Sequence, residues 1–261
     1  MTSLRVVQVT DCHLQEDPNQ HYRGTSSEDR LDRVLSHLVQ TKPELDLLLL
    51  TGDLVHHGFE SGYQRLASKV ASIANEVVWL PGNHDDWPRM QLHPALCKPV
   101  WSSDSTPWTI VSLRSIYESD GWGVGALGQE QCDWLIEQLD VLQRAGRWVL
   151  IALHHPVLDV GSAWQDAIKL ADARQLLAII ERAPHVKGVF SGHLHQQHDL
   201  SVKGVPFWVT PATASQFKAG TIEPEDELDE RLSLPGYRNF TLAEDGSLTT
   251  DVIRVEDELE T

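Results

Sequence analysis

Short apolar runs alternate with amphipathic stretches through most of the chain. Residues 4–10 and 45–50 are apolar runs that end in polar positions, and each predicts a buried strand. Between them, residues 27–40 carry Leu31, Val34 and Leu35 at helical spacing, which predicts a helix with one apolar face. A strand, a helix and a second strand in succession are typical of an α/β protein.

The same patterns predict the remaining elements. Helices are expected over residues 61–74, 128–144 and 172–182. Strands are expected over residues 76–80, 108–113, 148–153, 186–190, 199–202, 206–210, 237–242 and 247–255. The chain therefore changes from strand–helix units to a strand-rich end. We find no repeat and no linker, so we expect one domain over residues 1–261, with an acidic loop at 223–231 and a frayed tail at 256–261.

Polar side chains follow five of the predicted strands. These are Asp11 and His13, then Asp53, then Asn83, His84 and Asp85, then His154 and His155, and finally His193 and His195. Ligands bind outside the carboxyl ends of strands in open α/β sheets, so we expect the five segments to converge. Each segment alone suits an ordinary turn or helix cap, but folding gives no reason for imidazoles and carboxylates at five strand ends. Imidazole, carboxylate and amide ligands without thiolates favour Mn, Fe or Zn.

Composition narrows the class of protein further. The 38 Asp and Glu residues exceed the 21 Lys and Arg residues, and the formal charge of -17 disfavours a nucleic-acid partner. Three cysteines without a CxxC pair disfavour a disulfide framework and indicate a reducing cytosol. No apolar run approaches the roughly 18 residues of a membrane span, and the start lacks a signal-peptide pattern. We therefore expect a cytoplasmic protein with no membrane partner.

Read in order, the five polar segments resemble the signature of the calcineurin-like binuclear metallophosphoesterases. Within that superfamily, residues 7–14, 79–85 and 211–218 look like the bacterial class III 3',5'-cyclic-AMP phosphodiesterases. The likeness continues through residues 235–250 and so covers almost the whole chain. It implies a four-layer α/β/β/α sandwich, in which two mixed sheets are flanked by helices.

The resemblance also implies a site with two divalent or trivalent metal ions, Fe, Mn or Zn. One ion would be held by Asp11, His13, Asp53 and His195, and the other by Asp53, Asn83, His154 and His193. His154 is preferred to His155, because the family's ligand stands two places before the proline. The implied catalytic residues are His84, Asp53 and Asn83, and the implied substrate-binding residues are His84, Asn83, His13 and His154.

This chemistry has a physical reason. A phosphodiester repels hydroxide, and two cations about 3.5–4 Å apart lower the pKa of a bridging water, orient it for in-line attack and neutralise the phosphoryl oxygens. We expect the two oxygens of Asp53 to reach different ions and Asn83 to supply a neutral oxygen. His84 would then give a proton to the leaving 3'-oxygen. With cyclic AMP, the product would be 5'-AMP.

Several alternatives stay open from the sequence. One is another small phosphoester hydrolase of the same superfamily, and a second is a silent metal- or nucleotide-binding module. His57 stands where relatives often have an acidic residue, and Arg114 replaces a frequent Asp; Arg114 is either near the substrate phosphate or an ordinary surface residue. Trp87, Trp122 and Trp164 are candidates for a base-stacking wall or for the core. The oligomeric state is also open, with a homodimer as one possibility.

Overall fold

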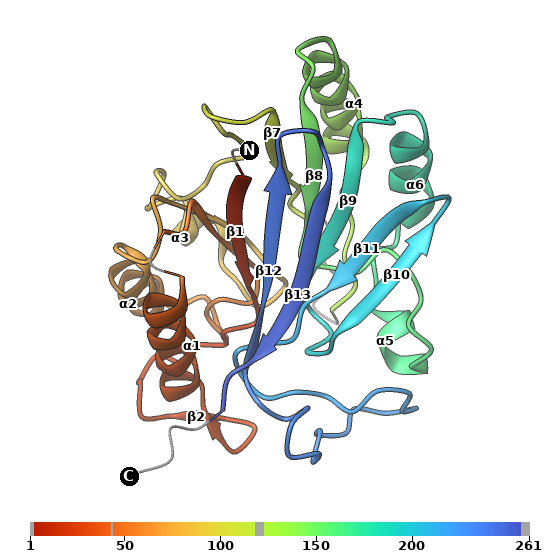
Figure 1. Cartoon of the computed structure of the whole chain (residues 1–261). Coiled ribbons are helices and arrows are strands. Elements are labelled where there is room, and N and C mark those ends of the chain that lie inside the picture. The colour runs from red at the N-terminus through yellow and green to blue at the C-terminus, as the bar shows by residue number, and fades with distance from the viewer. Residues whose placement is uncertain (1–2, 43, 118–122, 257–261) are drawn as a thin grey trace.

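Two mixed sheets form the centre of the computed structural model, which describes residues 3–42, 44–117 and 123–256 (Figure 1). The first sheet has the order β13-β12-β1-β4-β5, with the strands Leu248–Arg254, Gly236–Ala243, Ser3–Val9, Leu47–Thr51 and Glu76–Leu80. The second sheet has the order β10-β11-β9-β8-β7-β6, with the strands His198–Val202, Val205–Val209, Val186–Ser191, Trp148–Ala152, Trp108–Ser112 and Val100–Ser102.

Helices cover the outer face of each sheet. The helices α1 (Ser27–Thr41), α2 (Glu60–Val70) and α3 (Trp87–Met90) pack on the first sheet, and α4 (Gln129–Arg144) and α6 (Ala173–Glu181) pack on the second. A third apolar cluster, including Val6, Leu49, Leu150 and Phe190, fills the space between the two sheets. The expected four-layer α/β/β/α sandwich is therefore confirmed.

Helix α1 shows how local sequence sets an element. The side chain of Ser26 accepts a hydrogen bond from the backbone N–H of Asp29 at 3.1 Å, which caps the first turn. Two acidic residues in that turn complement the helix dipole. The predicted apolar stripe, here Leu31, Val34 and Leu35, is buried against the first sheet. Burial of this stripe fixes which face of the helix meets the sheet.

Strand direction brings the functional segments together. Strands β1, β4 and β5 run parallel in the first sheet, and β7, β8 and β9 run parallel in the second. Near the end of β1, the buried amide of Gln8 donates to Thr51 Oγ1 at 2.9 Å and to the Ser191 carbonyl at 3.0 Å. Thr51 ends β4 and Ser191 ends β9, so one side chain joins the carboxyl ends of both sheets.

Five features differ from the sequence-based expectation. The hairpin β2–β3 (His21–Tyr22 and Thr25–Ser26), the strand β6 and the helices α3 and α5 (Ala163–Ala167) were not predicted, because elements this short do not display a hydrophobic period. Helix α2 ends at Val70 instead of residue 74.

Two expected irregular segments have different outcomes. The loop over residues 223–231 is irregular and mostly exposed. Most of the predicted frayed tail, residues 257–261, lies outside the described residues. No helix within the described part of the chain has the length and apolarity needed to cross a bilayer.

Candidate metal centre

The five polar segments meet where the strands of both sheets end. Asp11 follows β1, Asp53 follows β4, Asn83 follows β5, and His154 and His193 follow β8 and β9. The donor atoms of Asp11, His13 and His195 lie within 4.8 Å of one another, and so do those of Asp11, Asp53 and His154. These residues, separated by up to 184 positions along the chain, therefore form one buried group.

The first half of this group contains two imidazoles and a carboxylate. His13 Nε2 lies 3.0 Å from His195 Nε2, and His195 Nε2 lies 3.4 Å from Asp11 Oδ1. Asp53 Oδ2 approaches the same place, 3.7 Å from His13 Nε2. Four donor atoms thus face a common point, which suits one cation of the kind that binds imidazole and carboxylate.

The second half shares Asp53 with the first. His154 Nε2 lies 3.3 Å from Asp53 Oδ2 and 3.1 Å from His193 Nδ1. Asn83 Oδ1 is buried, and no hydrogen-bond partner satisfies it within the described residues. A buried amide oxygen without a partner carries a desolvation cost that a cation would offset. The second donor set therefore also fits a metal ion.

Asp53 connects the two halves through one oxygen. Its Oδ2 faces the imidazoles of both halves, whereas its Oδ1 accepts a hydrogen bond from the backbone N–H of His84 at 2.9 Å. We expected the two oxygens to serve different ions. That expectation stays a prediction; of the two oxygens, Oδ2 is the one that lies near an imidazole of each half.

Backbone strain concentrates at the same residues. Seven non-glycine residues among those described have positive φ, and five of them are Asp11, His13, Asp53, His193 and His195. This region is disfavoured for residues with a Cβ, so it persists only where the surrounding structure enforces it. Such strain at five predicted ligands indicates a functional site more than an ordinary set of turns.

Two glycines allow the segments to approach this closely. A Cβ on Gly82 would lie 2.2 Å from Asp53 Oδ1 and 2.8 Å from His154 Nε2. A Cβ on Gly192 would lie 2.5 Å from Asp11 Oδ2. Any larger residue at these positions would push the carboxylates out of place, so both glycines are required by space.

Hydrogen bonds at the outer nitrogens orient the imidazoles. The Nδ1 atoms of His154 and His195 donate to the carbonyls of Thr51 at 2.9 Å and Ser215 at 2.6 Å. These bonds leave each Nε2 directed into the site. Outer partners of this kind fix the tautomer and ring orientation of metal-binding histidines. His13 differs, because its Nδ1 contacts another imidazole, His56 Nδ1, at 3.0 Å.

Asp85 fastens the loops that carry Asp53 and Asn83. It accepts hydrogen bonds from the backbone N–H groups of Leu54, Val55 and Gly82 and from the hydroxyl of Tyr63. Burial and the charge of Asp53 raise the pKa of Asp85 to about 6, and the backbone donors act in the opposite direction. Asp85 therefore has a structural role and is not directed at the ligand cluster.

Electrostatics favour neutral imidazoles around the two carboxylates. Burial lowers the pKa of His13, and burial together with the nearby His154 lowers the pKa of His193 to about 3. Burial also acts to lower the pKa of His154, but the charges of Asp53 and Asp11 outweigh it and raise that pKa to about 9. Neutral imidazole is the form that binds metal, so His154 would release a proton on loading.

Cys12 does not supply a ligand, although it stands between Asp11 and His13. Burial raises the pKa of its thiol to about 12, so the sulfur stays protonated at neutral pH. Among the described residues, Cys12 also belongs to none of the groups whose donor atoms lie close enough to share a metal ion.

His84 lies beside the cluster, and the partner of its Nδ1 atom is a backbone carbonyl and not a carboxylate. Its Nδ1 donates to the carbonyl of His56 at 3.1 Å, which leaves Nε2 as the nitrogen able to meet a substrate. The His84 ring is stacked on His56 with centroids 4.6 Å apart and meets the His13 ring edge-on at 5.0 Å. This position, half-buried next to the donor atoms, suits a group that acts on a bound phosphate.

His155 lies next to the cluster, with a donor atom within 4.8 Å of donor atoms of His154 and His193, so the preference for His154 stays a prediction. Its Nδ1 lies 2.7 Å from Ser115 Oγ, and its ring lies 4.5 Å from the ring of His193. The side chain is buried behind His193 and does not face Asp53 in any ion pair that the described residues make.

Sequence reasoning assigned no role to three residues that touch the site. These are His56, Ser115 and Tyr22, whose ring stacks on His13 with centroids 4.3 Å apart. His56 lies inside a quoted motif, and its position three residues after Asp53 was the available signal. Tyr22 belongs to the short hairpin β2–β3, for which the sequence pattern contains no signal.

The remaining sequence candidates have different surroundings. His57 is exposed, and Arg114 lies over the ring of Trp87 at 5.0 Å. Trp164 meets the ring of Phe217 edge-on at 5.1 Å. Trp122 lies outside the described residues.

Comparisons with known proteins show the family of the chain. The family model described as calcineurin-like phosphoesterase matches residues 4–197. A curated 3',5'-cyclic-nucleotide phosphodiesterase of a Nostoc strain is 34% identical over 254 residues, which cover 97% of this chain and 92% of that protein. The 3',5'-cyclic adenosine monophosphate phosphodiesterase CpdA of Escherichia coli K12 is also 34% identical, covering 97% of this chain and 90% of that protein.

Solved structures support the same fold. A dimetal phosphatase from Danio rerio superposes with a TM-score of 0.65 at 12% identity, covering 97% of this chain and 99% of that one. A purple acid phosphatase from yellow lupin gives a TM-score of 0.65 at 12% identity, covering 97% of this chain and 54% of that one. At such low identity these likenesses concern the fold alone.

Proposed function

The chain belongs to the calcineurin-like phosphoesterase family, and from this premise we propose that it hydrolyses the 3'-ester of 3',5'-cyclic AMP to give 5'-AMP. The family uses a dimetal centre, and the described residues provide two donor sets that share one carboxylate oxygen. That shared oxygen, Asp53 Oδ2, is the observation on which the reaction class rests. The cyclic-nucleotide substrate is supported by the names of relatives that cover nearly the whole chain.

The proposed ligands follow the two donor sets. One ion would be held by Asp11, His13, Asp53 and His195, and the other by Asp53, Asn83, His154 and His193. When bound, two cations such as iron, manganese or zinc supply Lewis acidity and bring the pKa of a coordinated water towards neutrality. Asn83 adds an oxygen without adding negative charge, so the centre remains attractive to an anionic phosphodiester.

His84 serves the leaving group in this proposal. Its Nε2 would donate a proton to the 3'-oxygen as the P–O3' bond breaks, while a hydroxide, formed from water by loss of one proton to solvent, forms the new P–O bond. The His56 carbonyl fixes the ring through Nδ1, and the backbone N–H of His84 is fixed by Asp53 Oδ1. Because the backbone of His84 is hydrogen-bonded to Asp53, the His84 imidazole keeps a fixed position relative to that carboxylate and to a phosphate bound beside it.

The net charge of -17 matches a small substrate better than a polyanion. A cyclic nucleotide carries a single negative charge, which a dimetal site neutralises locally. We propose no nucleic-acid partner and no membrane partner for this reaction, and a cytoplasmic setting where cyclic AMP is a signal.

A substrate comparison tests the proposal. Purified protein loaded with Mn, Fe or Zn in turn is assayed with cyclic AMP, cyclic GMP, bis-p-nitrophenyl phosphate and single-stranded DNA. We expect cyclic AMP to be cut with 5'-AMP as the product, and DNA to be left intact. Equal rates on the three small diesters, or no turnover of cyclic AMP under any metal, would reject the substrate and leave only a general phosphodiesterase.

A further inference from the structure

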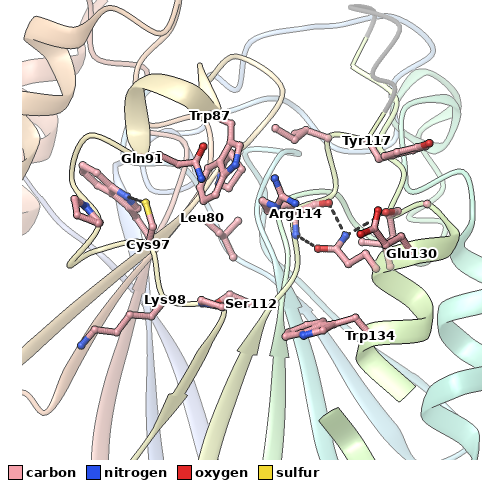
Figure 2. Close-up of a pocket in the computed structure, with 18 of the residues that line it drawn as sticks. Leu80, Trp87, Gln91, Cys97, Lys98, Ser112, Arg114, Tyr117, Glu130 and Trp134 are labelled. Carbon is pink, nitrogen blue, oxygen red and sulfur yellow. Dashed lines mark hydrogen bonds between the residues drawn. The ribbon is translucent and has the colours of Figure 1, made fainter. Parts of the chain in front are cut away.

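A large cleft lies between the edges of the two sheets, where β5 and β7 end (Figure 2). Its volume is about 1110 Å³, slightly above the roughly 300–1000 Å³ usual for small-molecule sites. One wall comes from the end of β5 and the segment around α3, and the other from the end of β7 and the start of α4. No residue of the proposed metal centre lines this cleft.

The loops that line the cleft also carry residues of the site. Pro81 lines the cleft and stands two residues before Asn83, and Trp87 lines it three residues after His84. On the opposite wall, Arg114 directly precedes Ser115, whose Oγ bonds His155. The loops that line the cleft therefore also carry Asn83, His84 and the hydrogen-bond partner of His155.

The walls are suited to a flat aromatic ring. Trp87 and Trp134 line opposite walls, and both are partly exposed (Figure 2). Partly exposed tryptophans beside a binding site provide stacking surfaces that tolerate any base. The guanidinium of Arg114 lies 5.0 Å from the centre of the Trp87 ring, so the cation already rests on one aromatic face.

Arg114 is held in place although it is exposed. Its backbone N–H donates to Gln131 Oε1 at 2.8 Å, and its carbonyl accepts from Gln131 Nε2 at 2.8 Å. Within the part of the chain that the structure describes, no carboxylate forms an ion pair with its guanidinium. In a protein with a net charge of -17, an exposed cation without such a partner is available to a ligand. Its N–H donors suit the ring nitrogens of adenine, which accept hydrogen bonds.

We propose that this cleft binds the purine base of the cyclic nucleotide, with Trp87 as the stacking surface and Arg114 as the hydrogen-bond donor. The inference rests on the proposed function, because it assigns a second contact to the same substrate. The phosphate lies at the donor cluster, and the base extends past Pro81 into the cleft. The cleft is thus a specificity site, and the metal centre, which contacts only the phosphate, is the reaction site.

Two diesters with the same reacting group separate the two roles. Cyclic AMP is compared with methyl β-D-ribofuranoside 3',5'-cyclic phosphate, which has a methyl group in place of the base. The variants are Trp87→Leu and Arg114→Gln. Because Arg114 is exposed, Arg114→Gln should fold normally and keeps the test valid if Trp87→Leu misfolds. Trp148→Leu is the matched control, because Trp148 is also partly buried with a cation on its ring, Lys187 Nζ at 4.1 Å, but it begins strand β8. Metal content is measured for every variant.

We expect Trp87→Leu to raise the KM for cyclic AMP about tenfold. This is the order of magnitude for removing one aromatic side chain that stacks on a base. The kcat/KM for the base-free diester and the metal content should stay at the wild-type values. Arg114→Gln should weaken cyclic AMP in the same selective way, and Trp148→Leu should keep the wild-type preference.

The failing outcomes are distinct. If the wild type cuts cyclic AMP but Trp87→Leu and Arg114→Gln leave its KM unchanged, the cleft is not the base site and the proposed function stands. Equal losses on both diesters would also overturn the inference, because they would place the two residues in support of the metal centre. If the wild type cuts the base-free diester as well as cyclic AMP, no base site exists. If it cuts neither, the proposed function fails with it.

Discussion

The contact between His13 and His56 makes a direct prediction about metal binding. The proposed ligands His154 and His195 are oriented by backbone carbonyls, but His13 Nδ1 meets the side chain of His56 at 3.0 Å. A side chain can be removed by mutation, whereas a carbonyl cannot. His56→Ala therefore tests how much the outer partner contributes to the ion held by His13.

The expected loss follows from two contacts. His56→Ala removes the outer hydrogen-bond partner of His13, and such losses cost about 10–100-fold in metal affinity. At about 1.4 kcal/mol per tenfold, this is about 1.4–2.8 kcal/mol. The substitution also removes the ring stacked on His84 at 4.6 Å, but the backbone carbonyl that holds His84 Nδ1 remains. We therefore expect a larger effect on metal affinity than on turnover at saturating metal.

The assay is metal content per chain after dialysis against buffers of graded free metal. Wild-type protein should retain two ions where His56→Ala retains one, and excess metal should restore most of the turnover. His56→Asn, which keeps an acceptor near the position of Nδ1, should recover part of the affinity. The control is His57→Ala, the exposed neighbour. Equal metal retention by wild type and His56→Ala, or an equal loss in His57→Ala, would refute the reasoning.

Three further predictions concern the donor cluster. Gly82→Ala places a Cβ 2.2 Å from Asp53 Oδ1, so it should abolish metal retention while circular dichroism shows a folded chain; retained metal would contradict the close approach. His84→Ala should keep both ions and lose about 100-fold or more in kcat, as for a general acid, whereas Asp53→Ala should lose the ions; the reverse pattern would exchange their roles. In metal-free protein, the pKa of His154 is raised to about 9 from 6.5, so its contribution to stability is full below pH 6.5 and is lost as the pH rises through 9. Urea unfolding should show this fall between pH 6.5 and 9 in wild type and a smaller one in His154→Asn; parallel curves would exclude the shift.

Long, periodic elements were predictable because the spacing of their apolar residues shows which face is buried. Helix α1 and strand β1 have an apolar pattern that matches the face or run they bury, and the structure places both within one residue of the predicted bounds. The four-layer fold was implied by the family resemblance and is confirmed by the two sheets and their helices.

The convergence of the strand ends was predictable, but the contacts around it were not. Parallel strands with polar ends indicate one shared edge, which is enough to bring Asp11 and His193 together. Which oxygen of Asp53 faces both halves depends on the backbone N–H of His84, and this direction has no signature in residue type. The stacking of Tyr22 on His13 likewise depends on a two-residue strand that has no hydrophobic period.

Anomalous diffraction from crystals of the protein soaked in Mn tests the dimetal centre most directly. We predict two peaks about 3.5–4 Å apart, with Asp53 Oδ2 between them, Asn83 at one peak and His13 at the other. A single peak, or two peaks that do not share Asp53, would contradict the account.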